Sequence, residues 1–182
     1  MNTLSENRKL TVEQYIKFEE LAEERHDFLN GQLTPKPSQS DRQNDICFNL
    51  HFVLRQHKIR NYSSVKVEIT ARERYVYPDL FITCDERDLA DHYIKRYPIV
   101  VFEVTSNSSK VFDKTGKFIE FQQIESLQHY VIVDSESIFV EIFSRDEFGK
   151  WTKSHVLHQL SDVLQLTALG LDLPLTDIYE EQ

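Results

Sequence analysis

Two acidic residues stand out because each lies in a stretch with the composition of a β-strand. Asp79 follows Pro78 within a strand predicted for residues 75–83, and Glu103 lies inside the apolar strand predicted for residues 99–105. A carboxylate in such surroundings is costly to desolvate unless a basic group or a cation meets it. Two neighbouring strands can direct their carboxylates to one point, and hard divalent ions such as Mg²⁺ prefer oxygen ligands. The pair therefore indicates either buried ion pairs or a metal site suited to phosphodiester hydrolysis.

The structural alternatives for these residues are specific. Asp79 after a proline suits a turn at a strand end, and Glu103 could form a buried ion pair with Lys66 or Arg74. Other catalytic patterns are missing from the sequence, which has no zinc-type histidine spacing, no G-x-S-x-G motif and no glycine-rich phosphate loop. The acidic pair is therefore the principal candidate for chemistry.

Hydrophobic periodicity and turn residues predict the elements that position these acids. Capping-box patterns at Thr11 and Ser40 each begin a helix, and Asn30-Gly31 predicts a tight hairpin between residues 25–29 and 32–34. The predicted helices cover about residues 11–24, 40–59 and 114–124, and the predicted strands cover 65–70, 75–83, 99–105, 130–134, 138–144 and 151–158. Residues 164–182 are expected to form a short packed segment and a helix. This order predicts a mixed α/β (α+β) fold with a central sheet.

Length and composition set the frame for this fold. The 182 residues predict a single domain over residues 11–182 after a flexible N-terminus of residues 1–10. With 40% apolar and 28% charged residues, the chain can bury one core. No apolar stretch approaches the roughly 20 residues of a membrane helix, and no secretory signal is present. Cys47 and Cys84 are expected to be reduced thiols, which predicts a cytoplasmic protein without a membrane partner.

The order of the acidic motifs resembles a known superfamily of nucleases. Pro78-Asp79 followed by Glu103-x-Thr105 resembles the core of the PD-(D/E)XK nucleases. A wider set of segments, spanning about Thr11 to Trp151, resembles the Uma-type restriction-endonuclease-like family of bacteria. These segments are residues 26–32, 77–80, 98–106 and 129–134, together with the pair Asp113 and Lys117.

This resemblance implies a restriction-endonuclease-like fold, in which helices flank a central mixed sheet beside an N-terminal helix and a small hairpin. It implies a metal-dependent endodeoxyribonuclease that uses Mg²⁺ or Mn²⁺, with DNA as substrate and a homodimer as the assembly. Asp79 and Glu103 would be the metal ligands, and the backbone carbonyl of Val104 could supply a further oxygen. Asp27 would hold or orient a metal-bound water, and Lys117 would replace the lysine that the superfamily places at the position of Thr105.

Several positions depart from the family or superfamily pattern, including Asn107 and Phe121, which replace a usual proline and a usual tyrosine. Asp27 is one methylene shorter than the usual glutamate, Gln43 stands where a histidine is common, and Thr105 stands where the superfamily has its lysine. These departures leave open an alternative, a catalytically impaired nuclease fold that serves as a DNA-binding or protein-interaction module.

The net charge of −9 excludes a basic nucleic-acid coat protein and an electrostatic membrane binder. The charge is uneven, because six bases and two acids between Arg55 and Arg74 give a local charge of +4. Tyr62, Tyr75 and Tyr77 are interleaved with these bases. This stretch is either a phosphate-facing surface or a solvated turn. We expect DNA binding to be weak without divalent ions and sensitive to salt.

Overall fold

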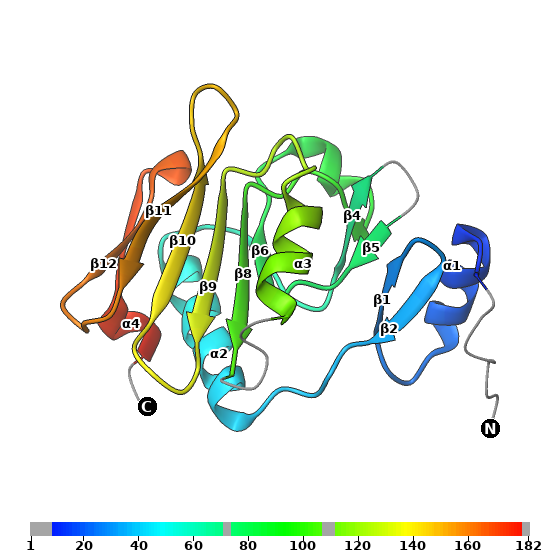
Figure 1. The fold of residues 1–182 in the computed structure, drawn as a ribbon, viewed down its shortest axis with the longest axis horizontal. Helices are drawn as coiled ribbons and strands as arrows, with labels where there is room; N and C mark the ends of the chain where they lie inside the picture. The colour runs from blue at the N-terminus through cyan, green and yellow to red at the C-terminus, as the bar shows by residue number, and fades with distance from the viewer. Residues whose placement is uncertain (1–8, 71–73, 107–111, 180–182) are drawn as a thin grey trace.

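The computed structural model describes residues 9–70, 74–106 and 112–179. Its strands form three sheets, and Figure 1 shows the two larger ones side by side. The six-stranded sheet has the order β11 (Trp151–Leu157), β10 (Val140–Arg145), β9 (His129–Asp134), β8 (Val100–Thr105), β6 (Leu80–Ile82) and β3 (Asn61–Tyr62). The five-stranded sheet has the order β2 (Gln32–Pro35), β1 (His26–Leu29), β5 (Arg74–Val76), β4 (Lys66–Thr70) and β7 (Ile94–Lys95). A small hairpin joins β12 (Val163–Leu166) to β13 (Leu171–Pro174).

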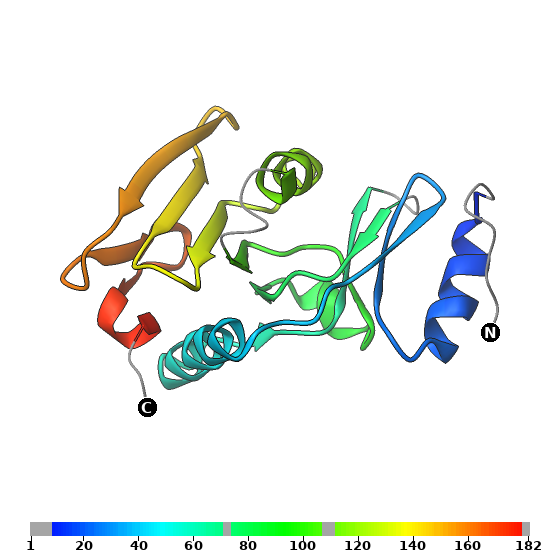
Figure 2. The same cartoon turned by 60° about the horizontal axis from the view of Figure 1, so that its bottom comes forward.

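The six-stranded sheet is the mixed central sheet that the sequence predicts. Strand β8 runs parallel to β9 and antiparallel to β6. All six residues of β8 are buried, because helices cover both faces of this sheet. Figure 2 shows α3 (Phe112–Phe121) on one face, with α2 (Asp41–Gln56) and α4 (Leu175–Tyr179) on the other.

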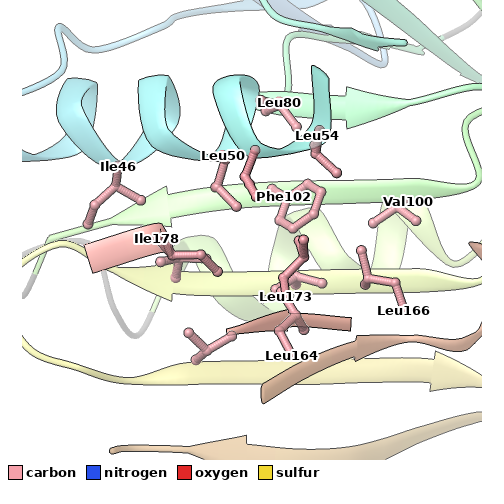
Figure 3. Close-up of a cluster of buried hydrophobic side chains, with 14 of the residues drawn as sticks. Ile46, Leu50, Leu54, Leu80, Val100, Phe102, Leu164, Leu166, Leu173 and Ile178 are labelled. Carbon is pink, nitrogen blue, oxygen red and sulfur yellow. The ribbon is translucent and has the colours of Figure 1, made fainter. Parts of the chain in front are cut away.

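The alternation of β8 divides its side chains between two cores. Phe102 and Val104 pack with Leu50 of α2 and with the leucines of β12 and β13, as Figure 3 shows for most of this cluster. Val101 packs on the opposite face with Phe121 and the residues after α3. Glu103 has the same parity as Val101, so its side chain projects toward the α3 face.

The five-stranded sheet carries the predicted hairpin. Asn30 and Gly31 both have positive φ angles, 53° and 88°, as the tight turn between β1 and β2 requires. Helix α1 (Val12–Leu21) covers this sheet, and Tyr15 stacks on Phe28 with ring centroids 4.6 Å apart. The predicted small hairpin therefore forms the edge of a larger sheet.

The single strand predicted for residues 75–83 is wrong, because the structure divides it into β5 and β6, which belong to different sheets. Pro78 lies between them and has no N–H group to donate to a ladder. Asp79 lies directly before β6 rather than within a strand. The chain therefore crosses from one sheet to the other at the residues that carry the first candidate acid.

The C-terminal segment also differs from expectation. The hairpin of β12 and β13 occupies most of the segment for which only a packed segment and a helix are predicted. Residues 85–97 contain the short 3₁₀ helix η1 (Glu86–Leu89) and β7, and a second 3₁₀ turn, η3 (Thr167–Leu169), joins β12 to β13. The predicted flexible N-terminus falls largely on residues 1–8, outside the described residues. Within the described ranges, no helix combines the length and apolar character needed to cross a membrane.

Candidate active site

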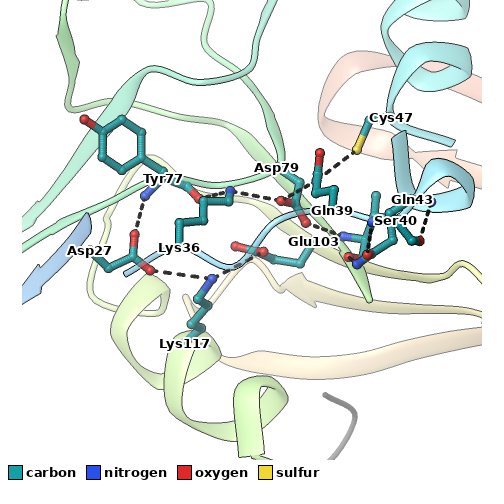
Figure 4. Close-up of polar contacts among 11 residues, drawn as sticks. Asp27, Lys36, Gln39, Ser40, Gln43, Cys47, Tyr77, Asp79, Glu103 and Lys117 are labelled. Atoms are coloured by element: carbon teal, nitrogen blue, oxygen red, sulfur yellow. Dashed lines mark hydrogen bonds and ion pairs between the residues drawn. The ribbon is translucent and has the colours of Figure 1, made fainter. Parts of the chain in front are cut away.

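The structure brings the four predicted side chains together in one cavity of about 280 Å³. Asp27 comes from β1, Asp79 from the connection before β6, Glu103 from β8 and Lys117 from α3. Figure 4 shows these side chains facing one another where the two larger sheets meet. Residues far apart in the sequence thus share one buried polar site. The side chain of Asp113 lies outside the part of the chain that the structure describes.

Asp79 is held against β8 by its own carboxylate. Leu80 is paired with Phe102 in the antiparallel ladder, which places Asp79 beside Glu103 and Val104. Its Oδ2 accepts a hydrogen bond of 2.8 Å from the Val104 N–H. The residue does end a turn, as its structural alternative predicts, but its side chain points into the cavity.

Glu103 is as deeply buried as Asp27, with 6% of its surface exposed. Its Oε2 lies 3.6 Å from the Lys117 Nζ, and its Oε1 has no hydrogen-bond partner among the residues that the structure describes. The alternative pairs with Lys66 and Arg74 are not formed, because Lys66 lies over the Tyr15 ring and Arg74 pairs with Glu120.

Burial also changes the acidity of this group. The pKa of Glu103 is raised to about 7, mainly by desolvation; the Lys117 ammonium opposes this rise, and the negative charge of Asp79 adds to it. The cavity therefore disfavours the ionised form of Glu103 unless positive charge is added. A carboxylate of this kind is typical of sites that bind a cation.

Lys117 links two of the acids. Its Nζ lies 3.7 Å from Asp27 Oδ2 and 3.6 Å from Glu103 Oε2. The other oxygen of Asp27 accepts a hydrogen bond of 2.8 Å from the Tyr77 N–H, which fixes the carboxylate against the residue that follows β5. Asp27 thus contacts the lysine directly and can orient it.

Gln43 has two roles at the edge of the cavity. Its Oε1 accepts from the Ser40 N–H in the capping box of α2, and its Nε2 donates to the Val104 carbonyl at 2.9 Å. The carbonyl predicted as a metal ligand therefore already receives a protein donor. Nearby, the Thr105 Oγ1 is buried and lacks a hydrogen-bond partner within the described residues.

Two residues of the site are missing from the sequence prediction. Lys36 Nζ lies 2.9 Å from Asp79 Oδ1, and Gln39 Nε2 donates to the same oxygen at 2.9 Å. Both residues belong to the connection between β2 and α2, which has no periodic pattern. Lys36 stands between Pro35 and Pro37, a pattern that does not by itself indicate a site.

The donor set fits a hard divalent cation. Within residues 9–70, 74–106 and 112–179, no group of three or more His, Cys, Asp and Glu side chains is placed to hold a metal. However, Asp79, Glu103 and the Val104 carbonyl present oxygen atoms at one end of the cavity. The unpartnered oxygens of Glu103 and Thr105 are buried there, and Mg²⁺ normally binds one or two carboxylates and keeps several waters.

The predicted basic surface is only partly exposed. Lys66 is buried, and Arg74 is committed to its ion pair with Glu120. Tyr75 and Tyr77 are buried, so their rings are not part of an exposed phosphate-facing surface. Tyr75, in β5, turns its ring toward the cluster beneath α1, where it packs with Tyr15 and Phe28. The exposed bases of this stretch, among the described residues, are Arg55, Lys58 and Arg60.

The chain matches one protein-family model and is similar in sequence to two cyanobacterial proteins. The model of the Uma2 family, described as "Putative restriction endonuclease", matches residues 12–176. The uncharacterized protein slr1290 of Synechocystis sp. is 31% identical over 177 residues, which cover 94% of this chain and 92% of that protein. The uncharacterized protein sll1609 of the same organism is 28% identical over 171 residues, which cover 90% of this chain and 96% of that protein.

A solved structure shares the fold. It is the crystal structure of a protein from Anabaena variabilis ATCC 29413 described as "a putative nuclease belonging to DUF820". The two chains superpose with a TM-score of 0.73 at 14% sequence identity, covering 93% of this chain and 97% of the other. The likeness confirms the predicted fold class.

Proposed function

We propose that the protein is a metal-dependent endonuclease that hydrolyses phosphodiester bonds of DNA. The chain belongs to the Uma2 family, whose model is that of a restriction-endonuclease-like nuclease. The observation that carries the proposal is the convergence of Asp27, Asp79, Glu103 and Lys117 in one cavity. Each of the three carboxylates lies within ion-pair distance of a lysine in this cavity.

Asp79 and Glu103, with the Val104 carbonyl, are the residues that would hold Mg²⁺ or Mn²⁺. The ion would supply an activated water and neutralise charge on the phosphate. The remaining chemistry belongs to the side chains around the ion. The raised pKa of Glu103 means that a positive ion at this position would favour its ionised form.

Lys117 is the residue proposed to stabilise the negative charge that develops on the phosphate. Its ammonium lies between Asp27 and Glu103, and the N–H of Tyr77 fixes Asp27 in turn. A donor whose position is fixed before the reaction contributes more than one that must reorganise. Asp27 is therefore proposed to position Lys117, in addition to the water-orienting role that the resemblance implies.

A second candidate function is a nuclease fold without catalysis, which serves as a DNA-binding or protein-interaction module. The specific observation in its favour is that both oxygens of Asp79 and the Val104 carbonyl already have protein donors, supplied by Lys36, Gln39, Gln43 and the Val104 N–H. In such a protein the polar cavity would be a closed network.

A panel of substrates separates these candidates. The protein would be incubated with plasmid DNA, single-stranded DNA, RNA and a cyclic dinucleotide, each with Mg²⁺, Mn²⁺ or EDTA. We expect cleavage of plasmid DNA that requires the divalent ion. Cleavage of RNA or the cyclic dinucleotide alone would assign a different phosphodiesterase, and no cleavage of any substrate would favour the non-catalytic module.

The assembly and the location are part of the same proposal. Cutting both strands of a duplex usually needs two sites, so we expect a homodimer, which light scattering after size-exclusion chromatography would detect. A nuclease acting on cellular or invading DNA with reduced cysteines fits the cytoplasm. Binding of DNA should be weak in EDTA and fall steeply with added salt.

A further inference from the structure

One lysine in the cavity has no part in the proposed mechanism. Lys36 reaches the carboxylate of Asp79, with its Nζ 2.9 Å from Oδ1, and also donates to the Tyr77 carbonyl. Figure 4 shows Lys36 on the opposite side of the acids from Lys117. The cavity therefore holds two cations, and the acid that Lys36 contacts is not one of the two that Lys117 contacts.

The backbone around Lys36 is fixed, whereas its ammonium lies at the end of a flexible stem. Pro35 and Pro37 restrict the chain on both sides, and the Lys36 N–H donates to the Arg25 carbonyl at 2.8 Å. Lys36 also lies at the border between the candidate site and a neighbouring cavity of about 820 Å³. The ammonium group can thus leave Asp79 without any change in the backbone.

The charges of the cavity explain why a cation is needed at this position. Its described lining contains the carboxyl groups of Asp27, Asp79 and Glu103 and the ammonium groups of Lys36 and Lys117. Lys117 contacts Asp27 and Glu103, while Lys36 contacts Asp79. Lys36 therefore neutralises the one acid that Lys117 does not contact.

The Lys36 ammonium occupies a place beside Asp79 Oδ1 that a metal ion bound to this oxygen would also occupy. A carboxylate offers about four lone-pair sites, and Asp79 already accepts from Lys36, from Gln39 and from the Val104 N–H. Lys36 and Gln39 occupy both sites of Oδ1, so a divalent ion that binds this oxygen must replace one of these two donors. The ammonium is the donor with the same kind of charge and the most mobile attachment.

We propose that Lys36 is a displaceable counter-ion of the metal site, which occupies Asp79 in the metal-free protein and competes with the divalent ion for that carboxylate. The proposal rests on the proposed function, because it assumes that Asp79 and Glu103 bind the ion. It adds that the Lys36 ammonium lowers the affinity of the site for metal. The ion binds Asp79 only at a concentration high enough to displace this ammonium.

Calorimetric titration with Mn²⁺, without DNA, tests the competition directly. Lys36→Met removes the charge and keeps the apolar stem, while Lys36→Gln also keeps a donor for the Tyr77 carbonyl. We expect both variants to bind Mn²⁺ at least about tenfold more tightly than the wild type. Lys36→Arg, which keeps the charge, should not bind more tightly. Mn²⁺ affinity equal to or weaker than that of the wild type in the folded neutral variants would overturn the proposal.

A matched control and a double variant make the result specific. Lys153→Met removes a lysine from its ion pair with Glu141 on the far strands of the six-stranded sheet, and should leave Mn²⁺ affinity unchanged. Adding Glu103→Gln to Lys36→Met should abolish the tight binding. If no variant binds Mn²⁺, the proposed metal site itself fails, whereas binding to the wild type without tightening in the Lys36 variants removes only the inference about Lys36.

Discussion

Replacing Glu103 by glutamine should stabilise the metal-free protein at neutral pH, although it removes a carboxylate from the candidate site. Burial raises the pKa of Glu103 from its ordinary 4.5 to about 7. One pKa unit corresponds to about 1.4 kcal/mol, so ionisation of this group in the folded protein costs about 3 kcal/mol. Glutamine has nearly the same shape and carries no charge, so it avoids this cost.

The direction of the pH dependence follows from the same pKa. The folded chain holds the Glu103 proton more tightly than the unfolded chain, so the stability from this group is complete below pH 4.5 and is lost as pH rises through about 7. The wild type and Glu103→Gln should therefore have similar stability near pH 4.5. Between that pH and about pH 8, the variant should gain up to about 3 kcal/mol over the wild type.

Urea denaturation in EDTA over a series of pH values measures this difference. The single tryptophan, Trp151, packs against Phe118 and reports unfolding by its fluorescence. Glu147→Gln, on the exposed turn after β10, provides the same chemical change away from the cavity. A stability difference between wild type and Glu103→Gln that does not change with pH, or that grows in favour of the wild type as pH rises, would refute the reasoning.

Three further changes test other parts of the site and the core. Lys117→Met should lower metal-dependent DNA cleavage at least about hundredfold in single-turnover assays, because it removes the ammonium aimed at the phosphate. Asp27→Asn keeps an acceptor for the Tyr77 N–H but loses the ion pair with Lys117, so cleavage should fall by about tenfold with little change in DNA binding measured in Ca²⁺. Leu50→Ala, at a fully buried position between α2 and β8, should lower the free energy of unfolding by about 2–5 kcal/mol in urea denaturation and leave Mn²⁺ affinity unchanged.

The parts of the fold that follow local rules were predictable from the sequence. The capping boxes at Thr11 and Ser40 begin α1 and α2 as predicted, and Asn30-Gly31 forms the tight turn. These features depend on residues only a few positions apart. The apolar strand β8 was predictable for the same reason, because a continuous apolar run is typical of a strand covered on both faces.

The division into sheets was not predictable in this way. Periodicity extends through residues 75–83, yet β5 and β6 pair with strands of different sheets. Strand partners are chosen by tertiary packing, and only Pro78 marks the position of the break. The burial of Lys66 and Tyr75 has the same origin, since it depends on the packing of α1 and the neighbouring strands.

Some residues of the candidate site were predictable from the sequence, and others were not. Asp79 and Glu103 were found because acids in apolar strands are costly, and Asp27 and Lys117 because their order resembles a family pattern. Lys36 and Gln39 were missed, because they lie in an irregular connection and reach Asp79 only through the tertiary fold. A lysine between two prolines is consistent with many surface turns, so its local sequence carries no signal of a site.

The central claim is that Asp79 and Glu103 act together to support metal-dependent cleavage of DNA. The most direct measurement is the conversion of supercoiled plasmid to nicked or linear DNA by the wild type, Asp79→Asn and Glu103→Gln, each with Mg²⁺ and with EDTA. We expect cleavage by the wild type in Mg²⁺ alone, and none above background for either folded variant. Cleavage that persists in either variant, or a wild type that is inactive with both Mg²⁺ and Mn²⁺, would contradict the account.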